Sequence, residues 1–256
     1  MFTSNPFAEL TASVSPSVIK AYVIIMIALV AGGTLYDIIH KKSARYFFDN
    51  WRKAKKNGTQ KVGGGELVSL AARTAVVEGL TSGEFCSARR RIAHLLTMYG
   101  FVVYAITTVI MVFWYTTPAI LTQLWYIGAL MVCLGGYWFW FFIRVDVAAE
   151  GNSPLRIVRA DLFILSLLAS VTLGLVWAIL QATDISWINV FLGLYLVATT
   201  VFFGSVPWSK FSHMFYKPAA AFQKRVEEAN GSRGNLPAPA DKPKDFGSVR
   251  QQPRHY

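Results

Sequence analysis

Five long apolar stretches alternate with polar segments along this chain. Each is about 20 residues long, the length of α-helix that crosses the hydrocarbon core of a bilayer. Ser15-Pro16 and Thr117-Pro118 stand before two of them, where a capping side chain followed by a proline favours the start of a helix. The stretches are residues 18–39, 92–115, 120–143, 161–181 and 187–206. The pattern predicts an all-α integral membrane bundle of five transmembrane helices.

Positive charge is distributed unevenly between these stretches. Residues 40–91 contain twelve lysines and arginines against four acidic residues, whereas the second connection contains no charge. The third connection carries Arg144, Arg156 and Arg159, and the fourth has only Asp184. Cytoplasmic loops of membrane proteins are enriched in lysine and arginine. We therefore expect the N-terminus outside and the C-terminus in the cytoplasm.

These features divide the chain into five parts. Residues 66–80 read as a short amphipathic helix with its apolar positions at Leu67, Leu70, Ala71 and Val77. Three roles are open for this helix: it lies on the membrane, it docks a partner, or it is a solvated connector. The C-terminal tail is rich in Gly, Pro, Ser and charge, so we expect it to be largely disordered. The parts are an external segment (1–17), the first transmembrane helix (18–39), a basic cytoplasmic loop (40–91), a four-helix membrane region (92–217) and a cytoplasmic tail (218–256).

Composition narrows the class of protein. Hydrophobic residues make up 54% of the 256 residues and charged residues only 15%, which is more apolar than a globular core requires. The two cysteines, Cys86 and Cys133, are too few for a disulfide scaffold, a zinc site or an iron–sulfur cluster. The net charge of +11 lies in the predicted cytoplasmic segments, so we expect membrane lipid and no nucleic acid as a partner. The first helix lacks the features of a cleaved signal peptide and is expected to be retained.

Histidines mark the candidate cofactor site. His94 is expected at the cytoplasmic start of the second helix and His213 just beyond the cytoplasmic end of the fifth, at similar depth. Two neutral imidazoles from different helices commonly hold a low-spin b-type haem. Gly100 could then admit the flat macrocycle, and Arg90 and Arg91 could pair with its propionates.

Other interpretations of these histidines stay open. His94 and His213 could instead be amphipathic side chains at the membrane interface, with no haem between them. His40, at the end of the first helix, is expected at comparable depth. It either replaces one member of the pair or anchors the helix at the interface.

Three motifs point to a family. They are RRIAHLLTMYGF from Arg90, SPLRIVRADLFILSLL from Ser153 and PWSKFSHMF from Pro207. Together they resemble the second, fourth and fifth helices of the nitrate reductase gamma-subunit family, five-helix membrane cytochromes b linked to quinone. The resemblance covers most of residues 89–217 and implies one haem b on the cytoplasmic side, ligated by His94 and His213. The family's second, outer haem needs two more histidines, and the matching positions are Tyr104 and Tyr195. The resemblance therefore implies no outer haem.

The chain resembles one branch of this family in three features: its short form, its long basic first loop and its ending HMFYKPAAAF from His213. That branch contains the membrane anchor of adenylylsulfate reductase and the membrane half of a quinone-interacting oxidoreductase subunit. The resemblance implies a multi-pass protein of the bacterial inner membrane. It also implies a cytoplasmic partner, adenylylsulfate reductase or a similar iron–sulfur flavoprotein, and quinone as a substrate.

The sequence is consistent with two functions. In the first, the chain is a non-catalytic electron-transfer subunit that links the cytoplasmic reductase to quinone through one haem. In the second, it is a cofactor-free membrane anchor for the same or a similar oxidoreductase. In both, the basic loop attracts an acidic partner. A small transporter is disfavoured, because the predicted spans carry few polar residues and no charge near mid-bilayer.

Overall fold

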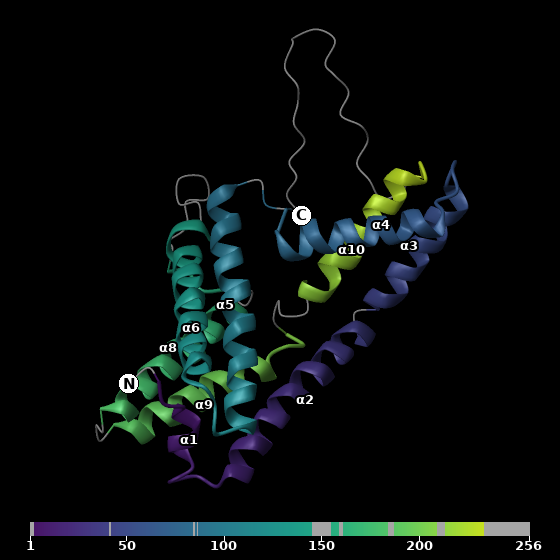
Figure 1. Cartoon of the computed structure of the whole chain (residues 1–256). Helices are drawn as coiled ribbons and strands as arrows, with labels where there is room; N and C mark the ends of the chain where they lie inside the picture. Colours follow the sequence, from purple (N-terminus) through teal and green to yellow (C-terminus); the bar gives the residue numbers. More distant parts are fainter. Residues whose placement is uncertain are drawn as a thin grey trace. The chain divides into compact units, whose positions relative to one another are not determined.

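The computed structural model of the chain is all-helical, with no strand in the part of the chain that it describes (Figure 1). That part is residues 3–40, 42–83, 85, 87–144, 155–158, 161–183, 187–208 and 213–232. The prediction of an all-α protein is confirmed there. In chain order the helices are α1 (Pro6–Leu10), α2 (Pro16–His40), α3 (Ser43–Asn57), α4 (Gly64–Thr74), the π-helical η1 (Ala75–Leu80), α5 (Ala88–Phe113), α6 (Ala119–Trp138), the π-helical η2 (Phe139–Ile143), α8 (Leu162–Ala182), α9 (Ile188–Gly204) and α10 (His213–Ala229).

The chain forms two compact units. The first, here called the bundle, consists of Met1–Asp37 and Ser87–Ser212. The second, here called the basic unit, consists of Ile38–Cys86 and His213–Tyr256. The structure thus groups the chain differently from the linear division expected from the sequence, because α10 packs with helices of the basic loop.

Four of the described helices are long and apolar enough to cross a membrane: α2, α5, α6 continued by η2, and α8. They coincide with the first four predicted stretches. The fifth predicted stretch contains α9, which is apolar but only 17 residues long. At 1.5 Å per residue such a helix is about 26 Å long, slightly shorter than a typical hydrocarbon core.

Glycines bring the bundle helices into close contact. α5 packs on α6, α6 on α8, and α8 on α9 (Figure 1). A Cβ atom on Gly100 of α5 would lie 2.7 Å from the carbonyl oxygen of Gly128, and one on Gly128 would lie 2.9 Å from that of Gly100. A Cβ on Gly135 would lie 2.6 Å from the carbonyl oxygen of Ala93. Small residues at helix contacts are typical of membrane bundles, because they allow the backbones to approach closely.

The short helix α1 closes one end of the bundle. The Asn5 side chain accepts a hydrogen bond from the Phe7 amide and so caps α1. Its Nδ2 donates to the carbonyl oxygen of Met111, in the last turn of α5, at 2.9 Å. Gln181 at the end of α8 donates to the carbonyl oxygen of Pro6. Asn5 thereby satisfies an amide at the start of α1 and a carbonyl at the end of α5, both of which lack intrahelical partners.

The basic unit is held by aromatic stacking and by one asparagine. Trp51 of α3 stacks on Phe222 of α10 at 5.7 Å between ring centroids. The Asn230 side chain donates to the carbonyl oxygen of Ala54, and its backbone carbonyl accepts from the Thr59 amide at 2.8 Å. Asn230 is 5% exposed, so these bonds lie inside the unit.

The structure corrects two expectations about the cytoplasmic parts. The helix expected at 66–80 begins earlier, as α4, and its second half is the π-helical η1. The boundary of the tail expected at residue 218 falls inside α10, which continues to Ala229. Residues 233–256 of the expected tail lie outside the described residues.

Candidate functional site

The first candidate ligand, His94, lies in the second turn of α5 and is half-buried. The helix begins at Ala88, so the arginines expected near the haem lie in its first turn. Arg90 is exposed and Arg91 is half-buried. Phe101 lies seven residues after His94 and therefore on the same face, and it packs edge to face on Phe202 of α9. His94 therefore lies on the side of α5 that is turned toward α9.

Gly100 does not belong to this face. A separation of six residues rotates it about 120° away from His94 around the helix axis. Its neighbours are Gly128, Met131 and Val132 of α6, and each would lie within 2.8 Å of a Cβ atom at Gly100. The space expected to admit a flat macrocycle beside Gly100 is thus filled by α6. The glycine is required for helix packing.

The second candidate ligand, His213, is the first residue of α10 and belongs to the basic unit. Its side chain lies outside the described residues, so its pairing with His94 stays a prediction. His40 is the last residue of α2 and is exposed. Of the two expected haem ligands, the structure therefore describes the side chain of only His94, which lies in the bundle.

Aromatic side chains fill the bundle interior deeper along α5. The hydroxyl groups of Tyr104 and Tyr195 are 3.0 Å apart and share a hydrogen bond. Trp125 lies against Tyr104 at 5.1 Å, and Trp177 stacks on Tyr195 at 5.9 Å between ring centroids. A Cβ atom on Gly174 would lie 2.8 Å from the Tyr104 hydroxyl oxygen. Tyr104 and Tyr195 thus bond to each other in a closely packed interior.

An ion pair that the sequence analysis missed joins the end of the η2 segment to the start of α8. Nη1 of Arg144 lies 2.5 Å from Oδ2 of Asp161, and the two side chains are 10% and 9% exposed. The guanidinium also lies over the Trp140 ring at 3.9 Å and donates to the carbonyl oxygen of Arg156. The same carboxylate accepts from the Val158 amide at 2.9 Å. The buried pair therefore fixes both ends of this connection. In the sequence it is visible only as two opposite charges 17 residues apart.

The part of the chain described by the structure thus defines a helical protein with four helices able to span a membrane. Among those residues, no group of three or more His, Cys, Asp or Glu is placed to hold a metal ion. No family model matches the chain, and no solved structure matches it. The chain is similar to Citrate utilization protein B of Escherichia coli, with 26% identity over 165 residues. The similar stretch covers 59% of this chain and 41% of that protein, so the chain spans less than half the length of its relative.

Proposed function

We propose that this chain is the membrane subunit of a bacterial oxidoreductase complex and resides in the inner membrane. Its five apolar helices would form the spans, with the N-terminus outside and the C-terminus in the cytoplasm. The observation that carries the proposal is the combination of a glycine-packed apolar bundle with a strongly basic helical unit. The bundle suits lipid, and the basic unit suits an acidic partner in water.

The proposed partner is a cytoplasmic flavin and iron–sulfur enzyme, adenylylsulfate reductase or one like it. Exposed cations on the basic unit would steer its approach through complementary charge. Lys53, Lys55 and Lys56 of α3 are exposed, as is Lys61 after it. The resemblance of the three sequence motifs to quinone-linked cytochromes b supports quinone as the other electron-transfer partner. In this proposal the chain itself performs no bond chemistry.

His94 and His213 would hold one b-type haem, and Arg90 and Arg91 would face its propionates. Bound there, the haem would supply a one-electron carrier between the partner and quinone. The half-buried position of His94 near the start of α5 supports this assignment, because Arg90 and Arg91 occupy the preceding turn. The tyrosine pair in the interior would keep electron transfer on the cytoplasmic side.

A cofactor-free anchor is the second candidate. The close contact of α5 with α6 at Gly100 and the aromatic interior around Tyr104 favour it, since both leave the described core filled by protein. The name of Citrate utilization protein B suggests a third role, in the use of citrate. Among the described residues, no lysine is buried. The buried arginine of the bundle, Arg144, already has Asp161 as its counter-ion. Neither observation points to a site for a tricarboxylate inside the bundle, so we favour the oxidoreductase subunit.

One experiment separates these proposals. The tagged full chain is purified from its native membrane in mild detergent, and the preparation is analysed for co-purifying subunits, flavin, iron and a reduced-minus-oxidised spectrum. One haem with bis-histidine bands is expected, lost in His94→Ala and in His213→Ala. His40→Ala is the matched control and should keep the bands.

Each other outcome has a defined meaning. A flavin and iron–sulfur subunit without any haem band would establish the cofactor-free anchor. Two haems per chain would assign a second site that includes His40. Recovery of the chain without an iron–sulfur flavoprotein, at every salt concentration tried, would overturn both forms of the proposal.

A further inference from the structure

The helix α3 has two different faces. Its inner face contains Phe47, Asn50, Trp51 and Ala54, at helical spacing, and these side chains are buried or half-buried within the basic unit. Trp51 also stacks on Phe47 at 6.2 Å between ring centroids. These contacts fix the orientation of α3 and determine which of its side chains face outward.

The outer face of α3 combines strong positive charge with exposed aromatic rings. The helix contains five basic residues against one acidic residue, Asp49. The side chains of Arg45 and Arg52 are 75% and 76% exposed. Tyr46 and Phe48 are 68% and 58% exposed, although rings of this size are costly to hold in water.

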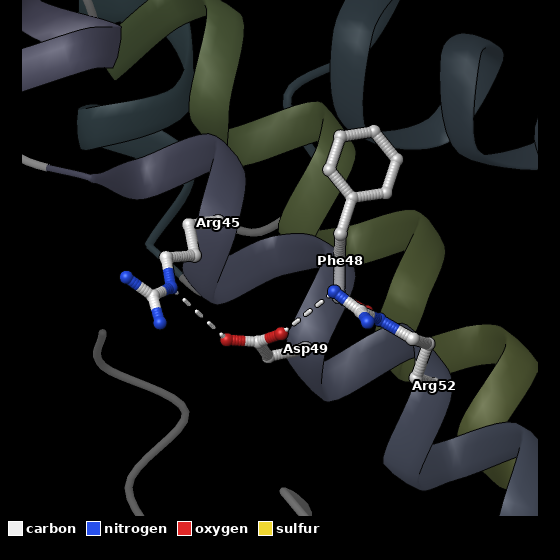
Figure 2. Close-up of polar contacts among 4 residues, drawn as sticks. All are labelled: Arg45, Phe48, Asp49 and Arg52. Carbon is white, nitrogen blue, oxygen red and sulfur yellow. Dashed lines mark hydrogen bonds and ion pairs between the residues drawn. The ribbon is translucent and has the colours of Figure 1, made fainter.

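Asp49 holds the two arginines on one surface, next to Phe48 (Figure 2). Its carboxylate lies 3.0 Å from Nη2 of Arg52 and 3.9 Å from Nε of Arg45. Nε of Arg52 also donates to the carbonyl oxygen of Phe48. Because these groups are exposed, the pairs add little stability, and an external phosphate can compete with Asp49 for both guanidinium groups.

The chain itself determines how far α3 lies from the end of α2. α2 is one of the helices able to span a membrane and ends at His40, and α3 begins at Ser43. Three residue steps reach at most about 11 Å. The headgroup layer on each side of a bilayer is several ångströms thick. If α2 crosses the membrane, the first turn of α3 therefore starts within or beside that layer.

We propose that α3 is an interfacial helix that binds the headgroups of anionic phospholipids. In this arrangement Arg45 and Arg52 bind phosphate groups, and Phe48 enters the boundary between headgroups and acyl chains. Basic residues beside aromatic residues are the composition of helices that lie on anionic membranes. For the surface around Arg45, Phe48 and Arg52 we favour lipid over an acidic protein, because α3 begins three residues after α2 and therefore starts beside the membrane if α2 spans it.

The test uses the full chain in lipid nanodiscs, with Cys86 and Cys133 replaced by alanine and a nitroxide label at Phe48→Cys. The accessibility of the label to oxygen and to a water-soluble nickel complex reports its depth. Phosphatidylglycerol should increase oxygen accessibility and decrease nickel accessibility relative to pure phosphatidylcholine. Glu228 of α10, which is exposed, gives the control label, and Glu228→Cys should respond to neither lipid.

Two charge variants sharpen the result. Arg45→Glu with Arg52→Glu should reduce the membrane-bound population by more than tenfold, since each cation near an anionic surface contributes roughly fivefold. Asp49→Asn should increase it, because it removes the competing carboxylate. A label that stays accessible to nickel in both lipids would overturn the proposal, as would one that becomes protected only when an acidic partner protein is added.

Discussion

The bundle and the basic unit are held together by different kinds of contact. In the bundle, the buried residues are mainly aromatic and aliphatic, and helix backbones touch at glycines such as Gly100 and Gly128. In the basic unit, buried polar side chains outnumber buried apolar ones among the described residues, and Asn230 joins α10 to the chain around α3. Lipid tails are as apolar as the helices, so the hydrophobic effect does not drive helix association in a membrane. Close packing of complementary helix surfaces has to stabilise the bundle instead. A small unit in water can instead use directed hydrogen bonds.

The largest effect is expected where two backbones meet in the bundle. Gly100→Ala places a Cβ atom 2.7 Å from the carbonyl oxygen of Gly128, and a backbone atom cannot move aside as a flexible side chain can. Separating α5 from α6 should cost about 3 kcal/mol or more, with loss of properly folded protein. The measurement is the thermal unfolding midpoint in detergent.

Gly193→Ala in α9 is the matched control, because a Cβ atom there has no neighbour within 4 Å. It should leave the midpoint unchanged or raise it slightly, since alanine favours a helix more than glycine does. Equal midpoints for the two variants would mean that α5 and α6 do not meet at Gly100.

This contrast also explains what the sequence could predict. A long apolar run predicts a helix without any knowledge of what that helix packs against. The predicted stretches therefore coincide with α2, α5, α6 with η2, α8 and α9. The neighbour of Gly100 could not be predicted, because the sequence does not say which face of α5 meets α6. The sequence analysis therefore related Gly100 to a haem, and its contact with α6 became visible only in the structure.

The helices of the basic unit were harder to predict for a physical reason. In α3 the inner positions Phe47, Trp51 and Ala54 have helical spacing, but charged residues surround them and the apolar set is small. α10 contains Pro218, which normally argues against a helix. The Arg144–Asp161 pair depends on a fold that brings the two residues together. The haem ligand pair His94 and His213 remains a prediction.

The two units each contain an arginine–carboxylate pair, which allows a direct comparison of burial. In the bundle, Asp161→Asn removes the charge that compensates Arg144, whose side chain is only 10% exposed. Breaking a pair that deeply buried should cost about 3 kcal/mol, because the guanidinium loses its counter-charge without regaining water. The loss should depend little on salt.

Thermal unfolding in detergent at low and high salt measures this effect. Asp161→Glu keeps the charge and tests the geometry, so it should retain more stability than Asp161→Asn. Equal stability of the wild type and Asp161→Asn would show that the pair does not fix the connection between η2 and α8.

The smallest effect is expected for the pair that joins two helices of the basic unit, α10 and η1. Nη2 of Arg225 in α10 lies 2.8 Å from Oε1 of Glu78 in η1, and the two side chains are 18% and 19% exposed. Glu78→Gln should destabilise the unit by about 1 kcal/mol, since partial exposure lets water replace much of the interaction. Amide hydrogen exchange should increase in η1 and α10 and stay unchanged in α5 and α6, and the difference from wild type should shrink as salt is added.

Glu66→Gln, at an exposed position in the first turn of α4, is the control and should change exchange in neither unit. A loss as large as that of Asp161→Asn would mean that the Glu78 pair is as strongly desolvated as the one in the bundle, and that the two units are less different than their cores indicate.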